Sequence, residues 1–127
     1  MGIRVRADTR EGLIAPAANG LYAAFGELTA ADDRITPFHF DQEGKDDAVL
    51  LRDFLTELLI LFEREHRILT AIESVDFSPQ RLQVAGKSAR VDQERSVFCR
   101  EVKAVTYHDL RIERVHARYE ATLIVDI

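Results

Sequence analysis

An amphipathic segment between Asp46 and Arg67 constrains the fold more than any other part of the chain. Asp46 and Asp47 stand where the N-terminus of a helix favours negative charge. The apolar residues that follow recur at helical spacing: Leu51, Phe54, Leu55, Leu58, Leu59 and Phe62. Charged residues lie between them, so this helix has one wide apolar face that must be buried against another layer.

The first part of the chain predicts a strand followed by a second helix. Residues 2–8 (GIRVRAD) alternate apolar and polar side chains, which is typical of a half-buried strand. Asp8 or Thr9 is a candidate helix cap, with Glu11 at the spacing of a capping box. Apolar residues recur at helical spacing from Ile14 to Leu28, although Pro16 should shorten or bend the first turns.

The remaining segments predict strands. Residues 35–40 contain Pro37, which favours an edge position. A turn at 78–81 separates two short strands, and a polar loop is expected over 86–96. Residues 102–112 and 117–127 predict a long hairpin.

The predicted order βαβαββββ indicates an α+β fold. We expect two helices packed on one face of a mostly antiparallel sheet. The length of 127 residues corresponds to a single domain, residues 1–127.

Composition excludes several classes of protein. The net charge of −5 argues against a protein that mainly grips nucleic-acid phosphates, and residues 1–63 hold 12 acidic side chains against 6 basic ones. No segment approaches the roughly 20 apolar residues of a membrane span, and the start resembles no signal peptide, so we expect a cytoplasmic location. Cys99 is the only cysteine, which excludes a disulfide framework and a thiolate zinc site.

Two places could carry chemistry. Lys103 lies in a predicted central strand, where a lysine must reach solvent, pair with an acid or face a functional surface. Asp126 stands next to the terminal carboxylate of Ile127, and oxygen ligands of this kind suit Ca²⁺ or Mg²⁺. The alternatives are a solvated sheet face for Lys103 and a frayed chain end for Asp126.

Two other candidate groups give weaker indications of a catalytic site. Cys99 stands among strand-like residues, where a lone cysteine is more often a small buried apolar residue than a nucleophile. A hydrolase site built on His108 and Asp109 is disfavoured because neighbouring residues of a strand face opposite ways.

Three motifs resemble the archease family. Residues 101–108 (EVKAVTYH) resemble its most recognisable motif, and residues 124–127 (IVDI) resemble its terminal hydrophobic-Asp-Ile ending. Residues 50–62 (LLRDFLTELLILF) are similar to its acidic-aromatic helix. The resemblance runs in order along essentially the whole chain.

The resemblance implies a non-enzymatic activator of an RtcB-type RNA ligase, which acts in tRNA splicing and RNA repair. Archeases promote GTP-dependent, metal-dependent guanylylation of a ligase histidine and multiple turnovers. The counterpart of Lys103 and a metal-binding acidic pocket are important in the family. That pocket would include Asp126 and Ile127 here, with no direct nucleic-acid or membrane contact expected.

The front of the chain departs from the family pattern. In archeases a His-Thr-Ala-Asp motif, which supplies a metal-ligating Asp, precedes an apolar residue and the first strand. Here Met1 occupies that apolar position, so the motif would lie before residue 1, and Asp8 falls at the far end of the strand. A late-assigned start codon or a shortened chain would explain this, and a stop codon directly upstream would contradict the first explanation. Weak or absent binding of Ca²⁺, Mn²⁺ or Mg²⁺ is therefore expected.

Two other functions remain open. A chaperone-like interaction module for RNA-modifying proteins, without a metal role, would bind a partner without a rate effect. A small metal-dependent hydrolase would need a full metal site, for which the sequence offers no spacing.

Overall fold

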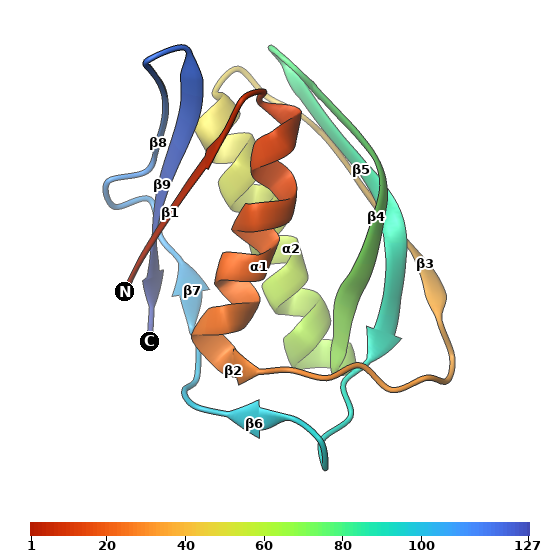
Figure 1. Ribbon diagram of the computed structural model, residues 1–127. Helices are drawn as coiled ribbons and strands as arrows, with labels where there is room; N and C mark the ends of the chain where they lie inside the picture. Colours follow the sequence, from red (N-terminus) through yellow and green to blue (C-terminus); the bar gives the residue numbers. More distant parts are fainter.

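The computed structural model describes residues 1–127 and has two helices between two antiparallel sheets (Figure 1). The helices are α1 (Ile14–Phe25) and α2 (Asp47–Glu65). The predicted α+β class is confirmed. The strands form two main sheets rather than the expected single sheet, so the helices are covered on both sides.

The first sheet is built around the last strand of the chain. This strand, β9 (Arg118–Asp126), pairs with β1 (Gly2–Ala7), β7 (Ala104–Val105) and β8 (Arg111–Val115). Its inner residues Ala121, Leu123 and Val125 are at most 1% exposed and belong to the core. The alternation predicted for the first and last strands is therefore confirmed.

The second sheet has the order β3-β5-β4, formed by β3 (Thr36–Glu43), β4 (Arg67–Ser78) and β5 (Arg81–Arg90). The β3 strand pairs with β5 alone, which confirms the edge position that Pro37 predicts. The β4 strand bulges between Leu69 and Ala71 and again before Ser74. Opposite the bulges, a Cβ on Gly86 would lie only 2.0 Å from the Ala71 carbonyl oxygen, so this close approach requires glycine.

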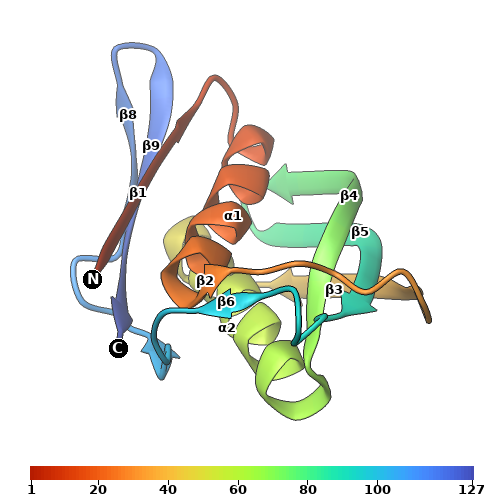
Figure 2. The same cartoon turned by 60° about the horizontal axis from the view of Figure 1, so that its bottom comes forward.

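Two short strands, β2 (Gly26–Glu27) and β6 (Val97–Phe98), pair at the ends of the helices that are lowest in Figure 1 and come forward in Figure 2. Gly26 ends α1 with φ of 142°, and a Cβ there would lie 2.0 Å from the Val97 carbonyl oxygen. Glycine therefore lets β6 lie directly against the end of α1.

The first helix begins later than its cap signals suggest. A 3₁₀ turn, η1 (Glu11–Leu13), precedes α1, and the Thr9 hydroxyl accepts a hydrogen bond from the Gly12 N–H at 3.0 Å. Pro16 falls in the first turn of α1, where a missing N–H breaks no helical hydrogen bond.

Two segments differ from the sequence prediction. Residues 86–90 continue β5 and are not loop. The strand predicted over 102–112 is interrupted: Ala104–Val105 pair with β9 as β7, a turn follows, and pairing with β9 resumes only at Arg111, where β8 begins. The Thr106 hydroxyl accepts a hydrogen bond from the His108 N–H at 3.2 Å, and Asp109 has φ of 51°. This local bonding competes with strand pairing.

Replacing the cap of α2 is expected to weaken the fold. The Asp46 carboxylate accepts hydrogen bonds from the N–H groups of Ala48 (2.9 Å) and Val49 (3.4 Å). The variant Asp46→Ala should lose about 1 kcal/mol of unfolding free energy in urea titrations. The exposed Asp33 makes no side-chain bond, so Asp33→Ala should change it by less than about 0.5 kcal/mol. Equal losses in the two variants would contradict the capping role.

A buried carboxylate ties β9 to β1. Glu120 is 8% exposed, and Arg6 Nε donates to its carboxylate at 2.7 Å, with Arg4 Nε at 3.6 Å. The hydrogen bond from Arg6 holds the pKa of Glu120 below its usual value. A lowered native pKa stabilises the fold at neutral pH, and that stabilisation is lost as the pH falls through the native pKa.

The variant Glu120→Gln should therefore be less stable than the parent at pH 7, and the difference should shrink progressively on acidification below the usual glutamate range. Urea titrations of both proteins at a series of pH values measure this. Glu27→Gln, at an exposed glutamate without an ion pair, is the control. A difference that does not change with pH would contradict the assignment.

Candidate functional site

The predicted site residues Lys103 and Asp126 lie side by side on neighbouring backbone segments. The Lys103 N–H donates to the Asp126 carbonyl oxygen at 2.7 Å. In the next pairs of the ladder, Ala104 lies opposite Asp126 and Val105 opposite Val125. The structure thus brings together two residues that are 23 positions apart in the sequence.

The first residue of the chain reaches the same place. The Met1 amino group donates to the Val125 carbonyl oxygen at 3.1 Å, and the Val125 N–H donates to the Met1 carbonyl oxygen at 2.8 Å. Both termini lie at this end of the first sheet (Figure 1). A segment attached to Met1 would therefore enter beside Asp126.

The charged side chains of Lys103 and Asp126 have no partners within the chain. Lys103, Asp126 and Ile127 are exposed, and neither the lysine nor the aspartate side chain forms an ion pair or hydrogen bond. Lys103 lies just before the outer strand β7, whereas β9 is the central strand, so its predicted central position is wrong. Its charge faces solvent and is available to a partner.

The helix α2 holds the lysine-bearing segment in place. Arg52 Nε donates to the Val105 carbonyl oxygen at 2.9 Å, and Nη1 contacts the Asp53 carboxylate at 2.8 Å. The same guanidinium lies 4.2 Å from the ring centroid of Tyr107. Arg52 therefore holds the end of β7 by a hydrogen bond and the residues that follow it by a cation–π contact.

The donor set does not make a complete metal site. Asp126 and the terminal carboxylate of Ile127 are adjacent, but nowhere in the chain do three or more His, Cys, Asp or Glu side chains come close enough to hold an ion. Ca²⁺ takes six to eight oxygen ligands, so these two groups fall short.

The alternative candidates are not assembled into a catalytic site. His108 Nε2 and an Asp109 carboxylate oxygen lie 3.5 Å apart in an exposed turn, so the expectation that they face opposite ways is wrong. Cys99 is exposed, not buried as expected, because the short strand β6 ends just before it.

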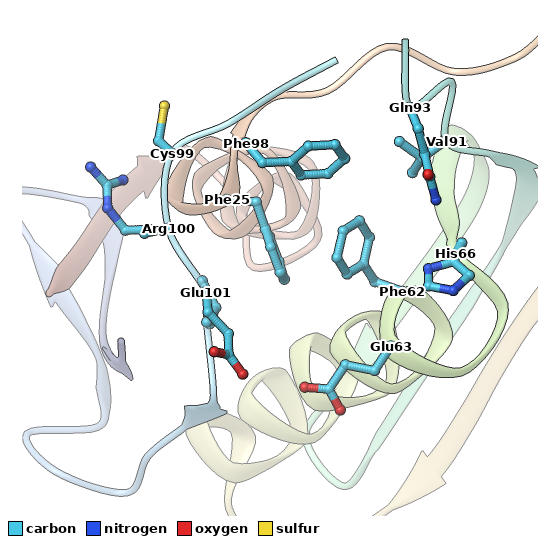
Figure 3. A pocket seen from close by; sticks show the side chains of 11 residues that line it. Phe25, Phe62, Glu63, His66, Val91, Gln93, Phe98, Cys99, Arg100 and Glu101 are labelled. Atoms are coloured by element: carbon cyan, nitrogen blue, oxygen red, sulfur yellow. The ribbon is translucent and has the colours of Figure 1, made fainter. Parts of the chain in front are cut away.

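Sequence reasoning missed a pocket of about 560 Å³ at the ends of the two helices. Three phenyl rings line it, those of Phe25, Phe62 and Phe98 (Figure 3). They come from α1, α2 and β6, and no sequence spacing connects these elements.

The sequence model of the Archease protein family matches residues 1–127. This chain belongs to the Archease family. The protein called archease from Methanopyrus kandleri is 31% identical, over 98% of this chain and 90% of its own length. The protein archease of Pyrococcus furiosus is 30% identical, over 100% of this chain and 92% of its own length.

Solved archease structures show the same fold. A Thermotoga maritima archease, described as a possible chaperone, superimposes with a TM-score of 0.75 at 16% identity, covering 100% of this chain and 90% of that one. A Methanobacterium thermoautotrophicum protein does so with a TM-score of 0.73 at 23% identity, covering 99% and 91%. No helix of this archease has the length and apolar character needed to cross a membrane.

Proposed function

We propose that this archease is a non-enzymatic activator of an RtcB-type RNA ligase in tRNA splicing and RNA repair. It promotes guanylylation of the ligase and its multiple turnovers. Family membership supports the proposal. The pairing of the Lys103 and Asp126 backbone segments supports a role for these two residues in it. Both side chains are charged, exposed and without partners in the chain.

The chemistry of the pair fits a protein that acts on an enzyme. The Lys103 ammonium is a point charge on a flexible stem, suited to a phosphate or an acidic group of the ligase. The Asp126 carboxylate offers the opposite charge on the neighbouring backbone segment. Since an exposed charge is only weakly stabilising by itself, its main effect is expected in the complex.

A multiple-turnover ligation assay tests the proposal. With limiting ligase, adding this protein should raise the number of RNA ends joined per ligase, while the protein alone joins none. An unchanged turnover number across a range of protein concentrations would contradict activation.

The alternative is a chaperone-like interaction module for RNA-modifying proteins. The Thermotoga maritima archease is described as a possible chaperone, which is the reason to test this second function. It predicts capture of a partner protein without an effect on the partner's rate. Capture from cells, followed by the ligation assay on the captured ligase, distinguishes the two functions.

Divalent cations should bind weakly to this chain by itself. Two carboxyl groups supply fewer ligands than a Ca²⁺ or Mn²⁺ site needs, and ligand charge sets affinity. Calorimetry should therefore show dissociation constants of about 10⁻⁴ M or weaker, and Asp126→Asn should weaken any residual binding. Micromolar binding that depends on Asp126 would contradict this.

A further inference from the structure

The pocket lined by the three phenyl rings lies where both helices end. Phe25 is the last residue of α1, Phe62 is near the end of α2, and Phe98 is on β6. The Phe25 and Phe62 ring centroids are 4.4 Å apart at 44°, and those of Phe62 and Phe98 are 6.4 Å apart at 51°. Phe98 is 49% exposed, so part of this aromatic wall is open to solvent.

Two carboxylates stand at the rim of this aromatic pocket. Glu63 and Glu101 both line it and are exposed, and neither forms an ion pair or hydrogen bond within the chain. Figure 3 shows both carboxylates on the same side of the opening. The lining residue Arg100 forms no ion pair with either carboxylate, and its Nη1 donates to the Ala24 carbonyl oxygen at 2.9 Å.

Phenyl faces beside unpaired carboxylates form an environment for an organic cation. A ring face attracts a cation electrostatically, and a guanidinium can also donate paired hydrogen bonds to carboxylates. Arginine is more suited to this than lysine because its planar, weakly hydrated group stacks on aromatic rings. The volume of about 560 Å³ lies within the range of ligand pockets and leaves room for neighbouring apolar groups.

We propose that the aromatic pocket receives an arginine side chain from the ligase, on a segment whose neighbouring apolar residues cover Phe98. This inference rests on the proposed function and adds a second docking point to it. The chain leads directly from Phe98, through the pocket residues Cys99–Val102, to Lys103 beside Asp126. One partner surface can therefore cover the pocket and the Lys103–Asp126 pair together.

Cys99 provides a reporter at the edge of the pocket, where its sulfur points away from the three rings (Figure 3). It is the only cysteine of the chain, it is exposed and it lines the pocket. The rate of its alkylation by N-ethylmaleimide, followed by mass spectrometry on this chain, is to be measured with and without saturating purified RtcB-type ligase. We expect the ligase to slow alkylation at least about tenfold, since the ligase segment that covers Phe98 also covers its chain neighbour Cys99 and excludes the reagent.

The double variant Glu63→Gln with Glu101→Gln tests the charge. Because both charge-assisted hydrogen bonds lose their carboxylate, the ligase should bind at least about tenfold more weakly. The matched control is Glu57→Gln with Glu94→Gln, at two exposed glutamates outside the pocket, which should bind like the parent. Equal urea midpoints of the variants and the parent establish intact folding.

A third measurement identifies the side chain that enters. Phenylglyoxal modifies accessible arginines, and complex formation with the parent protein should protect at least one ligase arginine. The Glu63→Gln, Glu101→Gln variant at equal concentration should protect it less. Absence of any protected arginine would overturn the proposal.

The outcomes separate this inference from the proposed function. If the ligase binds and is activated while Cys99 reacts at its free rate, or while the double variant binds like the parent, the pocket proposal is wrong and the activator function stands. If the ligase does not bind at all, both are wrong. Protection of Cys99 that rises with the concentration of this protein alone would show that a second copy covers the pocket and would overturn the proposal.

Discussion

Lys103→Ala is expected to remove most of the stimulation of ligase guanylylation. Its ammonium is exposed and unpaired, so the free protein does not depend on it, whereas a charge-assisted contact to a partner phosphate or carboxylate is worth about 1.5–3 kcal/mol. The rate of guanylylation at subsaturating activator should fall by about ten- to hundredfold. Asp126→Ala should produce a loss in the same direction, because its exposed carboxylate is on the backbone segment that pairs with that of Lys103.

Folding cannot account for these losses. The hydrogen bond between Lys103 and Asp126 joins an N–H and a carbonyl oxygen of the backbone, so both variants retain it. Lys87→Ala is the matched control, at an exposed lysine on β5 in the other sheet, and should stimulate like the parent. Full stimulation by Lys103→Ala and Asp126→Ala would remove both residues from the mechanism.

Phe54→Ala is expected to have the largest effect on stability. The side chain is fully buried on α2, with its ring centroid 5.6 Å from that of Phe40 and 6.3 Å from that of Phe38 on β3. Truncation leaves a cavity between helix and sheet and should cost about 3–5 kcal/mol of unfolding free energy. Since domains are stable by only about 5–15 kcal/mol, this is a large share of the total.

Urea titration of the parent and variant measures this loss. Phe98→Ala serves as the control, because its ring is 49% exposed and its removal should cost less than about 1.5 kcal/mol. If Phe54→Ala cost no more than Phe98→Ala, the helix α2 would not be packed on β3 as described.

The elements predicted correctly are those in which one face is buried, so that the apolar residues recur with the period of the helix or strand. The α2 helix follows from its apolar spacing and the Asp46 cap, and β1 and β9 follow from alternation. The continuous strand predicted over 102–112 is not formed because the conformation there depends on long-range contacts. Arg52 on α2 donates a hydrogen bond to the Val105 carbonyl oxygen, and its guanidinium lies over the ring of Tyr107. Residue periodicity carries no information about such a contact.

The candidate site was predictable only in part. The strand position of Lys103, the place of Asp126 next to the terminal carboxylate and then the family resemblance singled out these two residues. The structure places their segments side by side, and their role stays a prediction. The aromatic pocket could not be foreseen, because Phe25 and Phe62 fit the apolar faces of two helices. Only the pairing of β2 with β6 brings Phe98 to them.

The most direct test is the single-turnover guanylylation of a purified RtcB-type ligase by labelled GTP and a divalent cation, with and without this protein. If this protein is an activator, guanylate is loaded covalently onto the ligase at a faster rate in the presence of this protein, and the protein itself carries no label. An identical rate with and without saturating amounts of this protein would contradict the account.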